Sequence, residues 1–268
     1  MTTIPPMKWN SYLAGVVVLG LVSITARAVP VYESNEGGEY LISYQGLDRW
    51  GAGFLFSSWD RSVQIQGGGI TLENRLDVDR LTGYLSYHLL RTLDVYVAGG
   101  SADAEVGKTG ERKSASSDYA LGLRINILDH IIKDPILLED KIRLTASAQY
   151  SETKVDDLWI GGVGTARRTS WREKYGALNL AIINDVEGMV MFHPESIALN
   201  LGLIYHKLDG TLAFDDPRIE ADRIEAKNPT YFSAGVELFW TKRLSMEAAM
   251  LMGGGETKGT VAAIHLRF

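Results

Sequence analysis

The chain has 268 residues, no cysteine, 46% hydrophobic residues and a formal net charge of −6. The lack of cysteine excludes a disulfide framework and thiolate metal sites, and the acidic balance gives no reason to expect nucleic acid as a partner. A chain of this length can form one soluble α/β domain or one β-barrel, and hydrophobic periodicity distinguishes the two.

The amino terminus has the parts of a secretory signal peptide. Lys8 supplies a basic segment, residues 12–24 form a short apolar run, and Ala26 and Ala28 provide the small-x-small pattern of a signal-peptidase site. The apolar run is shorter than the ~20 residues of a membrane-spanning helix, although an uncleaved anchor is the alternative. We expect residues 1–28 to direct export through the Sec pathway and to be cleaved after Ala28.

Residues 29–48 allow three alternatives: a periplasmic lead-in, an extra strand or a short plug. Residues 40–44 are compatible with a strand. If this segment and residues 63–72 both pair into the sheet, the barrel has twelve strands. The remaining chain, residues 49–268, is expected to form one barrel domain.

Apolar side chains recur at every second position along the rest of the chain. The pattern is clearest at residues 119–127, 142–150, 197–205, 232–240 and 246–252. Successive side chains of a strand point to opposite faces, so each segment has an apolar face and a face of small and polar residues. Helical spacing does not produce this alternation. Ten strands are predicted, near residues 50–59, 80–90, 94–105, 117–128, 141–152, 172–184, 196–208, 230–241, 244–253 and 259–268.

The predicted connections alternate in length. Tight turns are expected on one side at residues 91–93 and 241–243, where two further connections, 129–140 and 185–195, are longer. The long polar connections are expected on the opposite side, at residues 60–79, 106–116, 153–171 and 209–229. Short periplasmic turns with longer outer loops are the layout of transmembrane barrels, and an even number of strands leaves both chain ends in the periplasm.

Aromatic residues cluster near the predicted strand ends, as in the aromatic girdles of membrane barrels. They are Trp50, Trp59, Tyr87, Tyr96, Tyr119, Tyr150, Trp171, Tyr175, Tyr205, Tyr231, Phe232, Phe239 and Trp240. A soluble sandwich with aromatic core ends is the alternative, but the faces opposite the apolar ones are too polar for a dry core. We therefore predict an all-β fold, a closed antiparallel transmembrane β-barrel of about ten strands, with eight or twelve as alternatives.

The final strand carries the most specific signal. Ile264, Leu266 and Phe268 occupy alternate positions, and the chain ends on the aromatic residue. This ending resembles the closing strand of bacterial outer-membrane β-barrel proteins of the porin-like superfamily, in which it forms the signal for the barrel assembly machinery. The resemblance is architectural, extends over the mature chain and identifies no subfamily. It implies a place in the cell outer membrane, with membrane lipid, lipopolysaccharide and the assembly machinery as partners.

The faces opposite the apolar ones predict a polar lumen. Opposite charges confined there should pair, because an unpaired buried charge is costly. We expect a charge cluster that narrows the periplasmic half, formed by Arg124, Arg143, Glu237, Glu247, His265 and Arg267. Other polar residues expected to face inward are His88, Asn126, Gln149, Asn179, Asn200 and His206. A packed interior without transport and a constriction for small solutes both remain open, since ten strands leave only a narrow interior.

A hydrolase at the outer rim is the main rival in function. Asp77 and Asp79 form an acidic pair, and His206 precedes Asp209 by three residues, so these groups could activate a water molecule. The arrangement is similar to that of the omptin proteases, but the Asp-x-His spacing of that family is absent. A lipid-modifying barrel enzyme is the other form of this alternative.

No other motif indicates catalysis. Ser86 and His88 share a strand face without an accompanying motif, and the five histidines lack metal-ligand spacing, so no metal or cofactor is expected. We predict a non-enzymatic barrel that is either structural or a narrow porin-like pore for small solutes. An adhesin that acts through the outer loops is a further alternative.

Overall fold

A computed structural model describes residues 49–268 except 68–69, 91, 108–110, 133–139, 186–193, 217–218, 220, 242 and 255–256. The predicted signal peptide, its cleavage residues Ala26 and Ala28, and the segment 29–48 lie outside the described residues. No helix in the described part of the chain is long and apolar enough to span a membrane. Its eleven strands are β1 (Trp50–Gly67), β2 (Ile70–Leu90), β3 (Leu93–Val106), β4 (Lys113–Ile132), β5 (Asp140–Ile160), β6 (Gly164–Asp185), β7 (Ser196–Phe214), β8 (Ala221–Ala226), β9 (Thr230–Thr241), β10 (Leu244–Gly253) and β11 (Lys258–Arg267).

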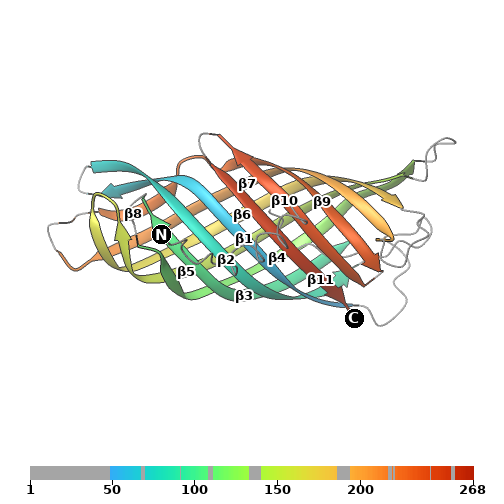
Figure 1. Cartoon of the computed structure of the whole chain (residues 1–268), viewed down its shortest axis with the longest axis horizontal. Helices are drawn as coiled ribbons and strands as arrows, with labels where there is room; N and C mark the ends of the chain where they lie inside the picture. Colours follow the sequence, from blue (N-terminus) through green and yellow to red (C-terminus); the bar gives the residue numbers. More distant parts are fainter. Residues whose placement is uncertain are drawn as a thin grey trace, which may run out of the picture.

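Ten of these strands form a closed antiparallel ring. β1 to β7 are neighbours in order, and β9, β10 and β11 follow. β11 returns to β1 along a ladder that runs from Gly51 opposite Arg267 to Asp60 opposite Lys258. Figure 1 shows the tilted strands around one long barrel, with β1 and β11 side by side. The ring leaves no open sheet edge, and the predicted closed barrel of ten strands is confirmed.

The eleventh strand, β8, belongs to one end of the barrel only. It lies between β7 and β1, where it pairs with Thr211 on one side and with Gln64 on the other. At the same end β3 pairs directly with β5, through Val106 and Ile160, beyond the start of β4. The strands therefore continue past the ten-stranded ring as a narrower end. We call this part the extension; it comprises the described residues within 58–79, 101–117, 152–172 and 207–227.

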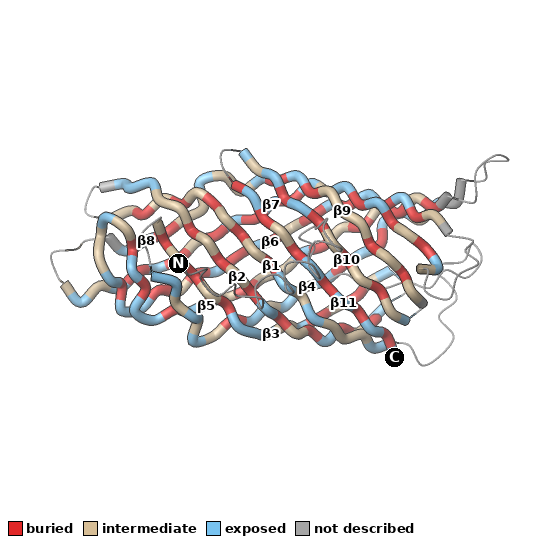
Figure 2. Tube along the Cα trace, in the orientation of Figure 1, coloured by how far each residue is buried: buried red, intermediate tan, exposed pale blue. Residues whose placement is uncertain are grey.

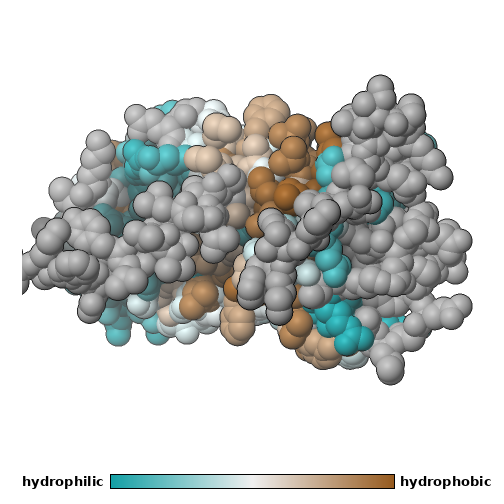
Figure 3. Space-filling model, turned by 45° about the vertical axis from the view of Figure 1, so that its right-hand side comes forward, coloured by the Kyte–Doolittle hydropathy of each residue, from teal (hydrophilic) through white to brown (hydrophobic). Residues whose placement is uncertain are grey.

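An apolar belt surrounds the rest of the barrel. On β4 the outward residues are apolar from Tyr119 to Ile127, and on β7 from Ile197 to Tyr205. These lengths match the ~9–11 residues that a tilted strand needs to cross a membrane. Figure 3 shows the hydrophobic band in the middle of the molecule, with hydrophilic residues on both sides. The belt consists of Phe54, Phe56, Leu81, Leu85, Leu89, Val97, Leu121, Leu123, Ile125, Ile127, Leu178, Leu180, Ile182, Leu199, Leu201, Leu203, Phe232, Met250, Met252, Ile264 and Leu266.

The polarity of the two strand faces reverses where the belt ends. On β7 the outward side chains change from Leu203 to Lys207, while the inward side chains change from Asn200 to Leu208. Buried and exposed residues still alternate without interruption, as Figure 2 shows along the strands. The belt region therefore has a polar interior and an apolar exterior, and the extension has the opposite arrangement. The reversal indicates that lipid contacts the belt and that water contacts the extension.

The interior of the extension is a packed apolar core. Its side chains come from seven strands and are almost completely buried. They are Val63, Ile65, Leu76, Val78, Ala102, Ala104, Val106, Val155, Leu158, Ile160, Ala166, Trp171, Leu208, Leu212 and Ile224. Such a core excludes water from this end of the barrel.

The prediction of long polar loops on this side is wrong for most of their length. β1 and β2 leave only residues 68–69 between them, and β5 and β6 leave only residues 161–163. Residues 63–72 accordingly extend β1 and β2 and add no strand to the ring. The segments looked like loops because their outward residues are polar, while Arg61 interrupts their inward apolar residues.

The predicted aromatic girdle is only partly correct. Trp50, Tyr119, Tyr205 and Phe232 are exposed on the outside. Six others fill the interior and are buried: Trp59, Tyr96, Trp171, Tyr175, Tyr231 and Phe239. A narrow barrel needs large inward side chains to fill its cross-section, so aromatic residues occur on both faces.

The position of the belt can be tested with two substitutions on the outward face of β7. Leu201→Arg places a charge in the belt and should lower the free energy of unfolding by about 2–4 kcal/mol. Thr211→Glu places a charge on the extension, opposite Arg223 of β8, and should change the free energy of unfolding by less than about 1 kcal/mol. Urea unfolding in lipid vesicles measures both. Equal losses would show that the belt does not contact lipid.

Candidate functional site

A buried carboxylate, Glu173 on β6, is the centre of an ion-pair cluster inside the barrel, where the belt meets the extension. Its side chain is 2% exposed. Arg80 on β2 donates to both oxygens, with Nη1–Oε2 and Nη2–Oε1 distances of 2.8 and 3.0 Å. Arg61 on β1 donates to Oε1 at 3.4 Å. The bidentate contact from Arg80 holds the carboxylate in one orientation inside the lumen.

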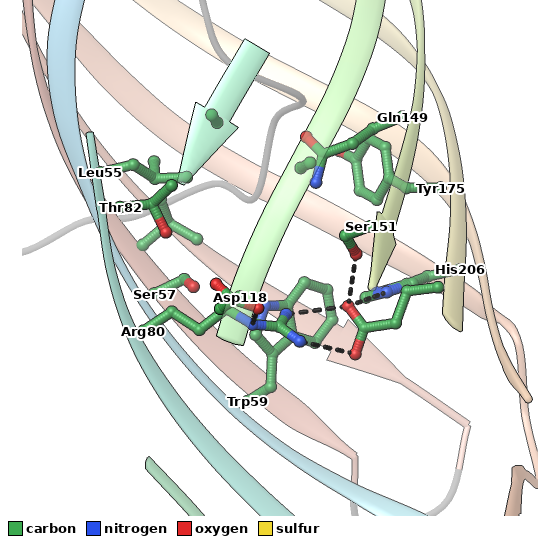
Figure 4. Close-up of a pocket in the computed structure, with 14 residues that line it drawn as sticks. Leu55, Ser57, Trp59, Arg80, Thr82, Asp118, Gln149, Ser151, Tyr175 and His206 are labelled. Atoms are coloured by element: carbon green, nitrogen blue, oxygen red, sulfur yellow. Dashed lines mark hydrogen bonds and ion pairs between the residues drawn. The ribbon is translucent and has the colours of Figure 1, made fainter. Parts of the chain in front are cut away.

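Neutral donors complete the surroundings of Glu173. The indole Nε1 of Trp171 and the Nε2 of His206 lie 3.2 Å from its oxygens, and the hydroxyl of Ser151 lies 3.4 Å away. Figure 4 shows the side chains of His206, Ser151 and Arg80, which come from separate strands, pointing toward the same carboxylate. The carboxylate thus accepts hydrogen bonds from five side chains, which offset the free-energy cost of removing it from water.

A second acid balances the charge of the cluster. Asp118 lies 3.4 Å from the Nε of Arg80. Thr153 links the two residues, because it accepts from Arg80 at 3.1 Å and donates to Asp118 at 2.6 Å. Two guanidinium groups therefore face two carboxylates in one buried network, with Arg61 as the other cation. A buried network that is charge-balanced and bonded holds its strands in one arrangement.

Aromatic rings enclose this network. Trp59 contacts His206 edge-on with ring centroids 4.7 Å apart, and it contacts Tyr231 at 5.7 Å. The guanidinium of Arg61 lies 5.0 Å from the centroid of the Trp59 ring. The cavity beside Trp59, Arg80 and Tyr175 measures about 50 Å³, which accommodates only a few water molecules. The network and the rings leave little room for water at this level of the lumen.

The predicted lumen cluster lies on the interior face of the barrel. All six residues, Arg124, Arg143, Glu237, Glu247, His265 and Arg267, are only 2–5% exposed. The polar residues predicted beside them also face inward: His88, Asn126, Asn179, Asn200 and His206 are buried, and Gln149 is half-buried.

Three of the six lumen residues come together. Glu237 on β9 and Glu247 on β10 are direct cross-strand neighbours. The Nε2 of His265 on β11 lies 3.9 Å from a Glu247 oxygen, and its Nδ1 is bonded to the hydroxyl of Tyr84. Ser245 donates to Glu237 at 2.9 Å. One ligand atom from each of the two glutamates and the histidine lies within 4.8 Å of the others, so these groups could hold a metal ion.

Arg143 belongs to a different contact. It donates to Asp129 on the neighbouring strand at 3.2 Å. Arg124 and Arg267 are buried on the interior face of β4 and β11. The predicted cluster is therefore a polar layer with at least two centres.

Sequence reasoning missed the Glu173 cluster, but it placed Glu237, Glu247 and His265 in one charge cluster. Arg61 and Trp171 lie in segments predicted to be loops, so the alternation that turns their side chains inward was not considered. The metal-ligand arrangement of the two glutamates and the histidine was also missed. These residues come from three strands, which is why a search for ligand spacing along the chain fails.

The Asp–His couple suggested for a hydrolase does not form, and the acidic pair is bound to an arginine. His206 points into the lumen, whereas Asp209 faces outward and accepts two bonds from Arg223 at 3.2 and 3.3 Å. Asp77 and Asp79 both pair with Arg112 on the outside of the extension. The prediction failed because residues three apart on a strand point to opposite faces.

His88, which shares its strand face with Ser86, has an acidic partner that the sequence did not indicate. Its Nδ1 lies 2.5 Å from an oxygen of Asp94, which follows the tight turn between β2 and β3. Ser86, His88 and Asp94 are all buried. The contact is a polar bond between adjacent strands of the lumen wall.

No protein-family model and no curated protein sequence matches the chain. Among solved structures, it is similar to the translocator domain of autotransporter NalP from Neisseria meningitidis, with 9% identity, a TM-score of 0.35, and coverage of 84% of this chain and 90% of that chain. The transport unit of the autotransporter AIDA-I from Escherichia coli gives 10% identity, a TM-score of 0.35, and coverage of 84% and 91%. The Acinetobacter baumannii outer membrane protein Omp33 gives 11% identity, a TM-score of 0.27, and coverage of 84% and 100%. These belong to the class that the closing strand resembles, the outer-membrane β-barrels, but the likeness is too low to bear on function.

The role of Glu173 can be tested by its removal. Glu173→Ala leaves Arg61 and Arg80 without their shared carboxylate in the lumen and should lower the free energy of unfolding by about 3–5 kcal/mol. Asp215→Ala is the control, because it breaks an exposed ion pair with Arg167 and should cost less than about 1 kcal/mol. Urea unfolding in vesicles gives both values. Similar small losses would mean that the cluster does not stabilise the barrel.

Proposed function

We propose that the protein is an integral β-barrel of the bacterial outer membrane with a sealed lumen, and that it serves as a structural barrel without an open pore. The apolar belt supports the membrane location, because monomeric soluble proteins rarely expose so large an apolar surface. The closed ring supports it as well, because only helices and closed barrels satisfy every backbone polar group in lipid.

The packed core of the extension is the observation that carries the proposal of a sealed lumen. Seven strands contribute apolar side chains to it, and Trp171 and Leu208 are among those that are essentially fully buried. A solute that passed through the barrel would have to displace this core and then the Glu173 network. Neither barrier is compatible with free diffusion.

The chain end supports the proposed location and orientation. Ile264 and Leu266 on β11, and Phe268 beyond it, are about half exposed on the outside of the barrel, where assembly machinery and lipid can contact them. Phe268 also exchanges backbone bonds with Trp50, at 3.0 and 3.3 Å. This end would face the periplasm, and the extension would face the outside. A narrow pore for small solutes is the alternative, and the conductance measurement distinguishes the two.

Purified protein in planar lipid bilayers should give no single-channel steps under conditions in which a reference porin conducts. The physical reason is the core around Leu208, which leaves no continuous water path. Regular steps from the wild-type protein would contradict the sealed lumen and favour the pore. A heat-modifiable gel shift of the same preparation verifies that the barrel is folded.

Deletion of Phe268 should impair assembly, because it removes the terminal aromatic residue and both backbone bonds to Trp50. The fraction of heat-modifiable protein in outer-membrane preparations should fall several-fold. Leu266→Val keeps an apolar side chain on the same face and is the control. Normal assembly of the deletion variant would show that the terminal residue is not part of the signal.

A further inference from the structure

A cationic surface lies directly above the apolar belt on one side of the barrel. On β6 the outward residues change from Leu178 through Gly176 to Lys174, and on β7 they change from Tyr205 to Lys207. The two lysines are direct cross-strand neighbours, and both are exposed. They are the first charged residues above the belt on these strands.

The neighbouring acids on the outer face are already paired. Asp209 is bonded to Arg223 of β8, and Glu152 contacts Lys154 at 3.1 Å and Arg172 at 3.8 Å. Lys174 and Lys207 have no ion-pair partner among the described residues. Like charges directly opposite each other on adjacent strands repel and destabilise the pair. An anion placed between the two ammonium groups would remove this repulsion.

The surface is shaped as a pocket. A hollow of about 390 Å³ lies between β5, β6 and β7. It is lined by Tyr150, Ser170, Arg172, Lys174, Lys207, Asp209, Gly210 and Thr211. Three cations, two hydroxyl side chains and the ring of Tyr150 thus surround one depression, together with Asp209, whose carboxylate is bonded to Arg223. Phosphate oxygens bind well to ammonium and hydroxyl donors of this kind.

Other strands do not repeat this pair of facing lysines. On β1 the first outward residue above the belt is Ser58, and on β2 it is Asp79. On β11 the first outward charged residue above the belt is Lys258, and it lies opposite Asp60 of β1. The facing lysines of β6 and β7 therefore form a local site.

We propose that Lys174 and Lys207 bind a phosphate group of lipopolysaccharide in the outer leaflet. This rests on the proposed outer-membrane location with the extension facing outward. Because the lysines follow the belt directly, their ammonium groups lie where hydrocarbon ends and lipid headgroups begin. A lipid bound there has its acyl chains along Leu178 and Leu203 and its phosphate in the pocket.

The test compares lipid binding by three forms of the full-length mature protein in detergent. They are the wild type, the double variant Lys174→Gln with Lys207→Gln, and a control with Arg167→Gln and Lys227→Gln, which removes the same charge from exposed ion pairs of the extension. The probe is fluorescently labelled lipopolysaccharide. The Lys174/Lys207 variant should bind about tenfold more weakly than the wild type, because two charge-assisted bonds are lost, and the control should remain within about twofold.

Two further arms identify the source of the anion. Dephosphorylated lipopolysaccharide should bind to the wild type as weakly as intact lipid binds to the Lys174/Lys207 variant. Phosphatidylglycerol vesicles should bind weakly to all three proteins. Equal affinity of the wild type and the double variant, or an equal loss in the control, would overturn the proposal; so would phosphatidylglycerol binding as strong as that of lipopolysaccharide. A gel shift on heating confirms that each variant is folded. Channel steps in planar bilayers would contradict the sealed lumen of the proposed function, but they would not bear on the lipid site.

Discussion

The pairing of β11 with β1 is the constraint on which the rest of the structure depends. Without it, two strands would present unpaired N–H and C=O groups, and lipid offers no partner for them. The ladder from Gly51 to Asp60 removes both edges, and the backbone bonds between Trp50, at the start of β1, and Phe268, just after β11, complete it. Closure also fixes the direction of every side chain. Each residue faces either the lumen or the surroundings, and its chemistry has to suit that side.

The lumen shows how this constraint is met with charged groups. A narrow ring forces inward side chains against one another, so Glu173 can be buried only because five donors reach it from β1, β2, β5, β6 and β7. The network joins strands that are not neighbours in the sheet, such as β2 and β6. It therefore links non-adjacent strands across the lumen, in addition to the hydrogen bonds between neighbouring strands. In the extension an apolar core around Leu208 and Trp171 connects the strands across the interior.

The ten strands of the ring could be predicted because an alternation of two residues has a single structural meaning when one face is continuously apolar. The extension could not, since its apolar residues lie on the inward face, where Arg61 interrupts them, and its outward residues are polar. Inward positions such as Arg124 and Glu247 followed from alternation alone. The contact between Arg80 and Glu173 spans 93 residues, and only the register of the folded barrel brings the two together. Residues three apart, such as His206 and Asp209, were misjudged because separation along the chain was considered without strand direction.

The reversal of polarity on each strand has a consequence for how the barrel sits in a bilayer. A shift of the barrel inward by two residues would draw Lys174 and Lys207 into hydrocarbon, and a shift outward would bring the ring of Leu178 and Leu203 into water. Both displacements are unfavourable, so the immersion depth is fixed by the sequence to within about one residue pair, and a thicker or thinner bilayer has to deform to fit it. The protein would therefore be sensitive to hydrophobic mismatch, and the tip of the extension would stand at a constant height above the lipid.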